Sequence, residues 1–383
     1  MQRILVFLIL WSVSAFAMLP QKVVVGYWQN WSPMTLPQIH NAYNVIQIAF
    51  ATTKSGSDCD MEFNLPYSYS VAQFKTDVMG LQAQGKSVIL SIGGASDPVI
   101  LDNSASVTTF VNSMNAIFIA YGDVFDGIDI DLESTSLQVG AWTMSSPSVV
   151  QTNIIASIKT LMKDYRARTG KKMLLTMAPE NVYLQGGLST WQVGNVNGGA
   201  YLPIVDALRD SIDLLHPQYY NAGGSKGGIV AWDGKVYFDT GSPDFLTSMT
   251  ETLIKGFTLV EGKGVFSGFP ASKIAIGLPA NDCTAAGTGY VTPADVALVM
   301  QYLRGEIPKP AAFSFTLQKS YPDLRGLMTW SINEDADACN GAWSFAENAE
   351  SVNQTTRLIP YKQNKLIRAI KNKYDLLGRL KSY

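Results

Sequence analysis

The sequence predicts an α/β protein with a single-domain (β/α)8 fold, the TIM barrel. Eight β-rich runs recur along the chain, and stretches with apolar residues at three- and four-residue spacing separate them. Strands that alternate with helices indicate a parallel sheet, and eight such units fit a closed barrel. A doubly wound open sheet is the alternative interpretation.

The first four strands are predicted from short runs rich in Val, Ile and aromatic residues. These runs are VVVGYW at 23–28, NVIQIAFA at 44–51, KSVILSIGG at 86–94 and FDGIDIDLE at 125–133. A helical pattern, SVAQFKTDVMGLQAQG, precedes the third run and ends at a glycine, which is a common helix stop.

The last four strands are predicted at 172–180, 212–221, 273–280 and 326–333. Helices are expected before the fifth strand, near 243–256, and in the tail at 361–378. The Gly- and Ser-rich segment that follows 221 predicts a loop or small hairpin on the upper rim. The interval between the seventh and eighth strands holds one loop and one helix, so it leaves no room for an inserted domain.

The composition is that of a compact globular protein. Of the 383 residues 47% are apolar and 16% charged, and the net charge of −2 argues against nucleic acid as the main partner. Residues 1–17 combine Arg3, a short apolar run and Ala15-Phe16-Ala17, which predicts a secretory signal rather than a membrane span. We expect residues 18–383 to form the barrel of a secreted, extracellular or periplasmic monomer that is free of the membrane after cleavage.

Three carboxylates alternate with three apolar residues in the fourth run. Because side chains alternate between the faces of a strand, Asp129, Asp131 and Glu133 share one face. The apolar residues between them suit the helix-facing side, so the carboxylates point into the barrel. Glu133 stands at the carboxyl end of its strand, where barrel enzymes have their active sites.

Successive carboxylates are about 6–7 Å apart along such a strand. Like charges at this spacing in a poorly solvated place cannot all ionise, so at least one proton stays. The pattern predicts that Glu133 is protonated near neutral pH, as a general acid must be. A divalent-metal site and a purely structural buried network are the alternatives.

FDGIDIDLE contains every fixed position of DGxDxDxE and thereby resembles the signature of glycoside hydrolase family 18, the chitinases and their relatives. SIGG at 91–94, QYYN at 218–221 and MTWS at 328–331 resemble further strand motifs of that family. The resemblance runs from about Val23 to the last helix. It is nearest to compact bacterial chitinases that lack an inserted α+β domain.

The resemblance implies retaining, substrate-assisted hydrolysis of β-1,4 bonds between N-acetylglucosamine units, with chitin or chito-oligosaccharides as substrate and neither cofactor nor metal. Glu133 would be the general acid and base, while the N-acetyl oxygen of the sugar attacks the anomeric carbon. Asp131 would orient the acetamido group, and Asp129 would share the proton that Asp131 gives up. Tyr220 would hydrogen-bond the acetamido oxygen.

The resemblance also implies a sugar-binding platform. Trp330 would stack under the sugar ring, because an aromatic face offers apolar area with a fixed orientation. The other residues expected in this subsite are Tyr27, Phe50, Gly94, Met177, Gln218 and Asn221. Trp28, Trp31 and Trp232 would extend the platform, and Ser91 could hydrogen-bond Asp129.

The cysteines and histidines suggest no metal site. Cys283 and Cys339 follow the seventh and eighth strands, so a disulfide between them is a hypothesis that leaves Cys59 free. His40 and His216 are far apart in sequence, and His216 is interpreted as a buried histidine with hydrogen-bond partners.

Two other functions remain open. An endo-β-N-acetylglucosaminidase would use the same carboxylates on N-glycans, and a non-catalytic chitin-binding lectin would use the same barrel. The presence of Glu133 argues against the lectin, since such proteins usually lack the acid.

Overall fold

The computed structural model describes residues 18–67, 69–222 and 237–354. Within them, eight parallel strands form the barrel wall in the order β12-β13-β1-β2-β4-β5-β6-β9. Their bounds are Val23–Gln29 (β1), Val45–Thr53 (β2), Ser87–Gly94 (β4), Gly127–Leu132 (β5), Leu174–Met177 (β6), Leu214–Leu215 (β9), Ala275–Pro279 (β12) and Gly326–Trp330 (β13).

The barrel closes between β9 and β12. Parallel bridges join Leu215 to Ile274 and Gln218 to Gly277, so the two ends of the strand order meet. β9 is much shorter than its predicted run because Pro217, which has no backbone N–H, interrupts it. The prediction of a single-domain (β/α)8 barrel is confirmed, and the open doubly wound sheet is excluded.

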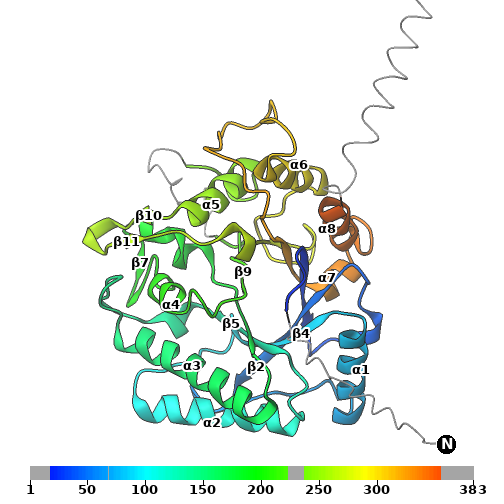
Figure 1. Cartoon of the computed structure of the whole chain (residues 1–383), viewed down its shortest axis with the longest axis vertical. Helices are drawn as coiled ribbons and strands as arrows, with labels where there is room; N and C mark the ends of the chain where they lie inside the picture. Colours follow the sequence, from blue (N-terminus) through cyan, green and yellow to red (C-terminus); the bar gives the residue numbers. More distant parts are fainter. Residues whose placement is uncertain (1–17, 68, 223–236, 355–383) are drawn as a thin grey trace, which may run out of the picture.

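Helices lie around the outside of the strands (Figure 1). Their bounds are Val71–Ala83 (α1), Ser104–Ala120 (α2), Val149–Thr169 (α3), Leu202–Ala207 (α4), Pro243–Lys255 (α5), Pro293–Arg304 (α6), Ile332–Ala336 (α7) and Ser344–Gln354 (α8). The first connection is an exception, since between β1 and β2 the chain forms only the 3-10 turn η1 (Leu36–Gln38). The expectation of a helix after every strand is therefore wrong at that place.

Additional short strands pair outside the barrel wall. β3 (Met61–Glu62) pairs antiparallel with β2. β7 (Gln192–Val193) pairs with β8 (Val196–Asn197), and β10 (Phe257–Thr258) pairs with β11 (Val265–Phe266). The segment between β12 and β13 forms α6 and its loops, as predicted, and holds no inserted domain.

Local sequence signals set the helix ends. At the start of α3, the Ser148 hydroxyl accepts a hydrogen bond from the Gln151 N–H, and the Gln151 side chain accepts one from the Ser148 N–H. This reciprocal capping box satisfies N–H groups that have no partner within the helix. Gly170 ends the helix in the left-handed conformation, with φ of 71°.

The strands separate two cores. Ile128, Ile130 and Leu132 of β5 belong to the large apolar cluster between strands and helices. A smaller cluster, which includes Val25 and Tyr27 of β1, fills the barrel interior. The alternation predicted for β5 is thus observed, and its carboxylates face inward.

Three predicted segments lie outside the described residues: the signal at 1–17, most of the Gly-rich loop with Trp232, and the tail helix at 361–378. In the described part of the chain, α8 packs beside β1 and β13. No helix there combines the length and apolar character needed to cross a bilayer.

Candidate active site

Two residues of the signature shape the strand that carries the carboxylates. A Cβ at Gly127 would lie 2.1 Å from the backbone oxygen of Leu174, so only glycine lets β5 and β6 approach this closely. The Asp126 carboxylate accepts a hydrogen bond of 2.8 Å from the backbone N–H of Val88 and so ties the start of β5 to β4.

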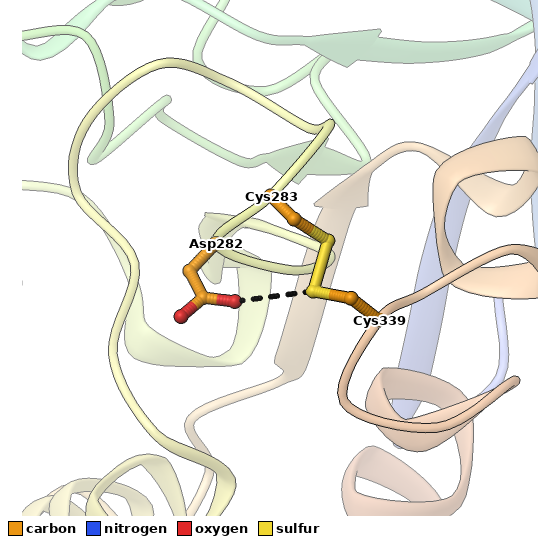
Figure 2. Close-up of side chains that lie close together, drawn as sticks. All are labelled: Asp282, Cys283 and Cys339. Carbon is orange, nitrogen blue, oxygen red and sulfur yellow. Dashed lines mark hydrogen bonds between the residues drawn. A yellow bond between two sulfur atoms is a disulfide. The ribbon is translucent and has the colours of Figure 1, made fainter.

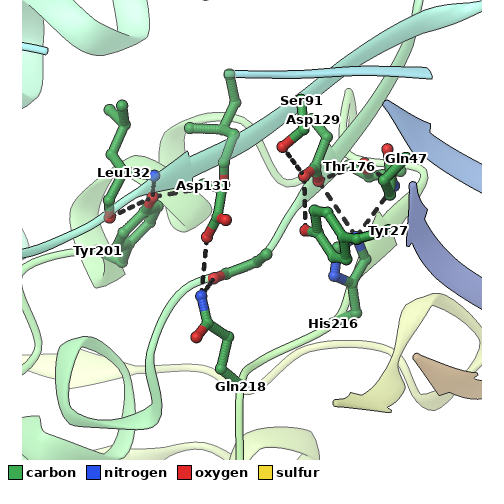
Figure 3. Close-up of polar contacts among 12 residues, drawn as sticks. Tyr27, Gln47, Ser91, Asp129, Asp131, Leu132, Thr176, Tyr201, His216 and Gln218 are labelled. Carbon is green, nitrogen blue, oxygen red and sulfur yellow. Dashed lines mark hydrogen bonds and ion pairs between the residues drawn. The ribbon is translucent and has the colours of Figure 1, made fainter. Parts of the chain in front are cut away.

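Asp129 is fully buried inside the barrel and is surrounded by donors (Figure 3). Tyr27 and Ser91 each donate a hydrogen bond of 2.7 Å to its Oδ2. Its Oδ1 accepts one of 2.6 Å from the Thr176 hydroxyl and lies 3.2 Å from His216 Nε2. The expected hydrogen bond between Ser91 and Asp129 is therefore present.

One amide joins the two outer carboxyl groups. Gln218 Nε2 lies 2.8 Å from Asp131 Oδ1, 3.0 Å from Glu133 Oε1 and 3.0 Å from the carbonyl oxygen of Ala178. Two amide hydrogens thus face three acceptors. This arrangement holds the Asp131 and Glu133 side chains against each other at the mouth of the barrel.

Three carboxyl groups of the site, those of Asp131, Glu133 and Glu180, have pKa values above the usual range. Burial, together with the charges of Glu133, Asp129 and Glu180, raises the pKa of Asp131 well above its usual range. Burial also raises the pKa of Glu133. Burial and the charge of Glu133 raise the pKa of Glu180 to about 7. The raised pKa of Glu133 is a shift in the direction that a general acid needs.

The outer carboxyl groups open into a cavity of about 170 Å³. Its lining residues are Phe50, Ala95, Asp131, Glu133, Gln218, Tyr220, Asn221, Ala286 and Trp330. A larger cleft of about 850 Å³ shares Phe50, Ala95 and Trp330 with this cavity, so the two adjoin each other. Trp31 and Tyr67 add exposed aromatic surface to the larger cleft.

An aromatic stack forms the floor where the two cavities meet. The rings of Phe50 and Trp330 lie nearly parallel, with centroids 5.7 Å apart. The Tyr27 ring lies 5.5 Å from Trp330, and Trp31 lies 6.2 Å from it. Gly94 lines the larger cleft and leaves room for the stack, because a Cβ there would lie 2.8 Å from the Phe50 ring.

Seven of the expected site residues line the cavity, namely Phe50, Asp131, Glu133, Gln218, Tyr220, Asn221 and Trp330. Asp129 lies buried below them, Gly94 and Trp31 line the larger cleft, and three other residues lie elsewhere. Tyr27 lies beneath the cavity, almost fully buried, and contacts Trp330 and Asp129, so the expectation that it lines the subsite is wrong. Met177 packs in the cluster between strands and helices, so the expectation that it lines the subsite is wrong. Trp28 is buried in that same cluster, so it does not extend the platform.

The sequence did not point to several residues that hold the β5 carboxylates in place. Gln47 donates to the Thr176 hydroxyl over 2.9 Å, and both residues are buried polar groups on inward-facing strand positions. A polar residue within an apolar strand run was the available signal. Tyr201 also contributes, since its hydroxyl bonds both the N–H and the carbonyl of Leu132. It fixes the backbone directly before Glu133.

The predicted disulfide between Cys283 and Cys339 is present (Figure 2). Asp282 Oδ1 lies 3.5 Å from Cys339 Sγ. Among the described residues, these three are the only group whose potential ligand atoms lie mutually within 4.8 Å. Because the two sulfurs are bonded to each other, they offer no thiolate to a metal ion. Cys59 is a free thiol, as expected.

Comparisons with known proteins identify the family of the chain. The model of glycosyl hydrolases family 18 matches residues 23–335. Chitinase Chi52 of Paenibacillus xylanexedens is 37% identical over 325 residues, which are 82% of this chain and 59% of that protein. Chitinase D of Niallia circulans is also 37% identical, with the same coverage, so the chain spans little more than half the length of these two relatives.

A solved structure supports the fold assignment. A chitinase of family GH18 from Chromobacterium violaceum superposes with a TM-score of 0.74 and 35% identity, covering 88% of this chain and 84% of that one. A probable class II chitinase of Arthroderma benhamiae is 34% identical over 79% of this chain and 90% of its own length. The chain is therefore a member of glycoside hydrolase family 18.

Proposed function

We propose that this chain is a chitinase, which hydrolyses β-1,4 bonds between N-acetylglucosamine units with retention of configuration. The observation that carries the proposal is the pair of Asp131 and Glu133, held by one Gln218 amide in a cavity floored by Trp330. The names of the 37% identical relatives, both chitinases, support the same substrate class.

In the first step, Glu133 gives its proton to the glycosidic oxygen. Its raised pKa supports this role, since the acid must still hold the proton when the sugar binds. The acetamido oxygen of the substrate attacks the anomeric carbon as the bond to the leaving sugar breaks. This internal nucleophile replaces the second enzyme carboxylate of an ordinary retaining glycosidase.

Asp131 and Tyr220 position the acetamido group in this proposal. Both line the cavity beside Glu133. Asp131 accepts a hydrogen bond from the acetamido N–H and stabilises the positive oxazolinium ion, while the Tyr220 hydroxyl donates to the acetamido oxygen. Water then opens the oxazolinium ring, with the ionised Glu133 as general base.

Trp330 and its neighbours bind the sugar. The Trp330 and Phe50 rings present apolar surface suited to the C–H face of a pyranose. Asn221 lines the same cavity and accepts a hydrogen bond from the Thr288 N–H, which fixes its side chain. The aromatic surface of Trp31 in the adjoining cleft extends the platform for a longer oligosaccharide.

A substrate comparison tests the proposal. The purified protein is incubated with N-acetylglucosamine tetramer to hexamer and, separately, with a high-mannose glycopeptide. Cleavage of the oligomers is expected, and the glycopeptide should stay intact. Cleavage of the glycopeptide alone would indicate an endo-β-N-acetylglucosaminidase, and oligomer binding without turnover would indicate a lectin.

We also propose that the protein is exported, that residues 1–17 are removed, and that it acts as a monomer. The apolar run at the amino terminus and the disulfide Cys283–Cys339 support export, because disulfides persist in oxidising compartments. Mass spectrometry of protein from the culture medium should find a chain that begins at Met18. Light scattering should give the mass of one chain.

A further inference from the structure

The larger cleft beside the catalytic cavity is lined by a single charged residue. Among the residues that the structure describes, Asp97 is the only Asp, Glu, Lys or Arg in its lining, and the others are aromatic, aliphatic or neutral polar. The Asp97 carboxylate makes no hydrogen bond or ion pair within the described part of the chain. An unpaired negative group in an otherwise neutral cleft attracts a ligand that carries a positive charge.

The floor of the cleft is a row of aromatic rings. The Trp330 and Phe50 rings have centroids 5.7 Å apart, and those of Phe50 and Trp31 lie 6.3 Å apart with 26° between their planes. Trp31 is 59% exposed, so it offers its surface to a ligand. Such rings suit the C–H faces of pyranose sugars. The cleft can therefore take sugars beyond the one that lies over Trp330.

The lining residues show which part of the substrate enters the cleft. The cleft shares Phe50 and Trp330 with the catalytic cavity, whereas Glu133 lines the cavity alone. In the proposed reaction, Glu133 protonates the oxygen on the reducing side of the sugar over Trp330. The cleft then takes the sugars on the non-reducing side of the cut, so Asp97 faces a sugar that does not react.

A short loop after β4 positions Asp97. Gly94 ends the strand, and its Cβ position would lie against the Phe50 ring. On the far side of the loop Val99 is fully buried, and its N–H donates a hydrogen bond of 2.9 Å to the Ser136 hydroxyl. Residues 95–98 alone lie between these two anchors. A group that is already held in place costs less to order when a ligand binds.

We propose that the Asp97 carboxylate binds the protonated free amine of a glucosamine unit, so that the substrate favoured by this chain is partly deacetylated chitin. The ammonium group and the carboxylate would form a charge-assisted hydrogen bond. The cut itself stays at an N-acetylated sugar, because the acetamido group is the nucleophile there. This inference rests on the proposed function and narrows its substrate class.

A contact to sugar hydroxyl groups is the other role open to Asp97, since a carboxylate accepts hydrogen bonds from them as well. The two roles differ in their consequences. A hydroxyl contact would serve acetylated and deacetylated chains alike. A pairing with ammonium would serve only chains that contain free amines, and salt would weaken it.

Affinity electrophoresis tests the pairing without turnover. Glu133→Gln protein, alone and combined with Asp97→Asn or Asp102→Asn, is run at weakly acidic pH through gels that contain glycol chitin or partly deacetylated chitosan. Asp102→Asn is the matched control. It removes the same charge from the same loop, does not line the cleft, and keeps the oxygen that accepts from Asn103.

We expect Asp97→Asn to weaken the affinity for chitosan about two- to fivefold, the usual effect of an exposed ion pair, and to leave that for glycol chitin unchanged. Asp102→Asn should change neither affinity. Equal losses for both polymers, equal losses in both variants, or unchanged binding of chitosan by Asp97→Asn would each overturn the proposal. Failure of the proposed hydrolysis would leave these results unchanged.

Product sequences give a second test, which needs no variant. Wild-type protein digests partly deacetylated chitosan, and mass spectrometry reads each product from its new reducing end. We expect glucosamine above the polymer average at one fixed position beyond that end. The excess should shrink when salt rises from about 0.1 M to about 1 M, because the screening length falls from about 10 Å to about 3 Å. Glucosamine at the polymer average at every such position would overturn the proposal.

Discussion

Glu133 is the outermost carboxyl group of the β5 stack and lies on the wall of the cavity. Its neighbours restrict it closely. Gln218 bonds its Oε1, and Tyr201 anchors the Leu132 backbone that precedes it. Burial raises its pKa, which is the shift that the proposed role of Glu133 as general acid and base requires.

Replacing this acid should stop turnover without abolishing binding. Glu133→Gln keeps the size of the side chain but has no acidic proton, so we expect kcat to fall about 10²- to 10⁴-fold. Calorimetry with N-acetylglucosamine tetramer should give an affinity close to that of wild type. Glu347→Gln, a change at an exposed position of α8, is the control. A Glu133→Gln enzyme within tenfold of wild-type kcat would contradict the assignment.

Glu180 should make stability depend on pH. Its pKa rises from 4.5 to about 7 on folding, so the folded state binds this proton more tightly than the unfolded chain. The stabilisation is complete below about pH 4.5 and is lost as pH rises toward about 7. We therefore expect the melting temperature of Glu180→Gln to fall less than that of wild type between about pH 5 and pH 8. Equal falls in both proteins would exclude this contribution.

At the scale of elements, both β5 and β6 were predicted as strands, but the sequence showed which residues face the barrel interior only for β5. In β5 polar and apolar residues alternate, so one face had to be the helix-facing side. In β6 Leu174, Leu175 and Met177 are all apolar, because a parallel strand of a barrel is buried on both faces. The pattern therefore could not show that Thr176 faces inward and Met177 outward.

The sequence also could not predict how deeply the Tyr27 side chain is buried. The position of Tyr27 at the end of β1 predicted its neighbourhood correctly, but whether its ring lies on or beneath the floor depends on Trp330 and Phe50 from distant strands. His216 was correctly expected to be a buried, hydrogen-bonded histidine. Its partner could not be predicted, because Asp129 comes from a strand 87 positions earlier in the sequence.

The end of β4 must stay free of side chains. Gly94 has φ of 85°, and a Cβ there would lie 2.8 Å from the Phe50 ring. Gly94→Ala should therefore lower the free energy of unfolding by about 1–2 kcal/mol from backbone strain, and raise KM by displacing Phe50. Gly80→Ala is the matched control, since Gly80 lies in α1 with no atom within 4 Å of its Cβ position.

This control should behave in the opposite way. Alanine favours a helix interior over glycine by about 0.5–1 kcal/mol, so Gly80→Ala should stabilise the protein slightly and leave KM unchanged. Urea denaturation and steady-state kinetics of both variants measure the two effects. A Gly94→Ala protein as stable as wild type, with the same KM, would show that the close approach to Phe50 does not matter.

At the scale of the whole molecule, the disulfide joins the loops that follow β12 and β13. The β12 loop contributes Ala286 to the cavity, and β13 contributes Trp330. Both cysteines follow adjacent strands of a barrel, which is why their pairing could be predicted from the sequence. The bond therefore connects two parts of the rim of the active site.

Its removal should destabilise the fold. The bridged cysteines are 56 residues apart, for which the chain-entropy model gives about 4 kcal/mol. We expect the double variant Cys283→Ser/Cys339→Ser to lose about 2–4 kcal/mol of unfolding free energy, as measured by urea denaturation. Cys59→Ser, a change of the free thiol, should have little effect. An unchanged double variant would argue that the bridge does not constrain the chain.

The central claim is that the acetamido group of the substrate, and not a second enzyme carboxylate, attacks the anomeric carbon while Glu133 supplies the proton. The most direct measurement is the anomer of the product in the first seconds of hydrolysis, by NMR with N-acetylglucosamine pentamer and with a partly deacetylated chitosan. We expect the β-anomer, with an N-acetylated sugar at every cleaved position. The α-anomer, or cleavage at sugars that carry a free amine, would contradict the account.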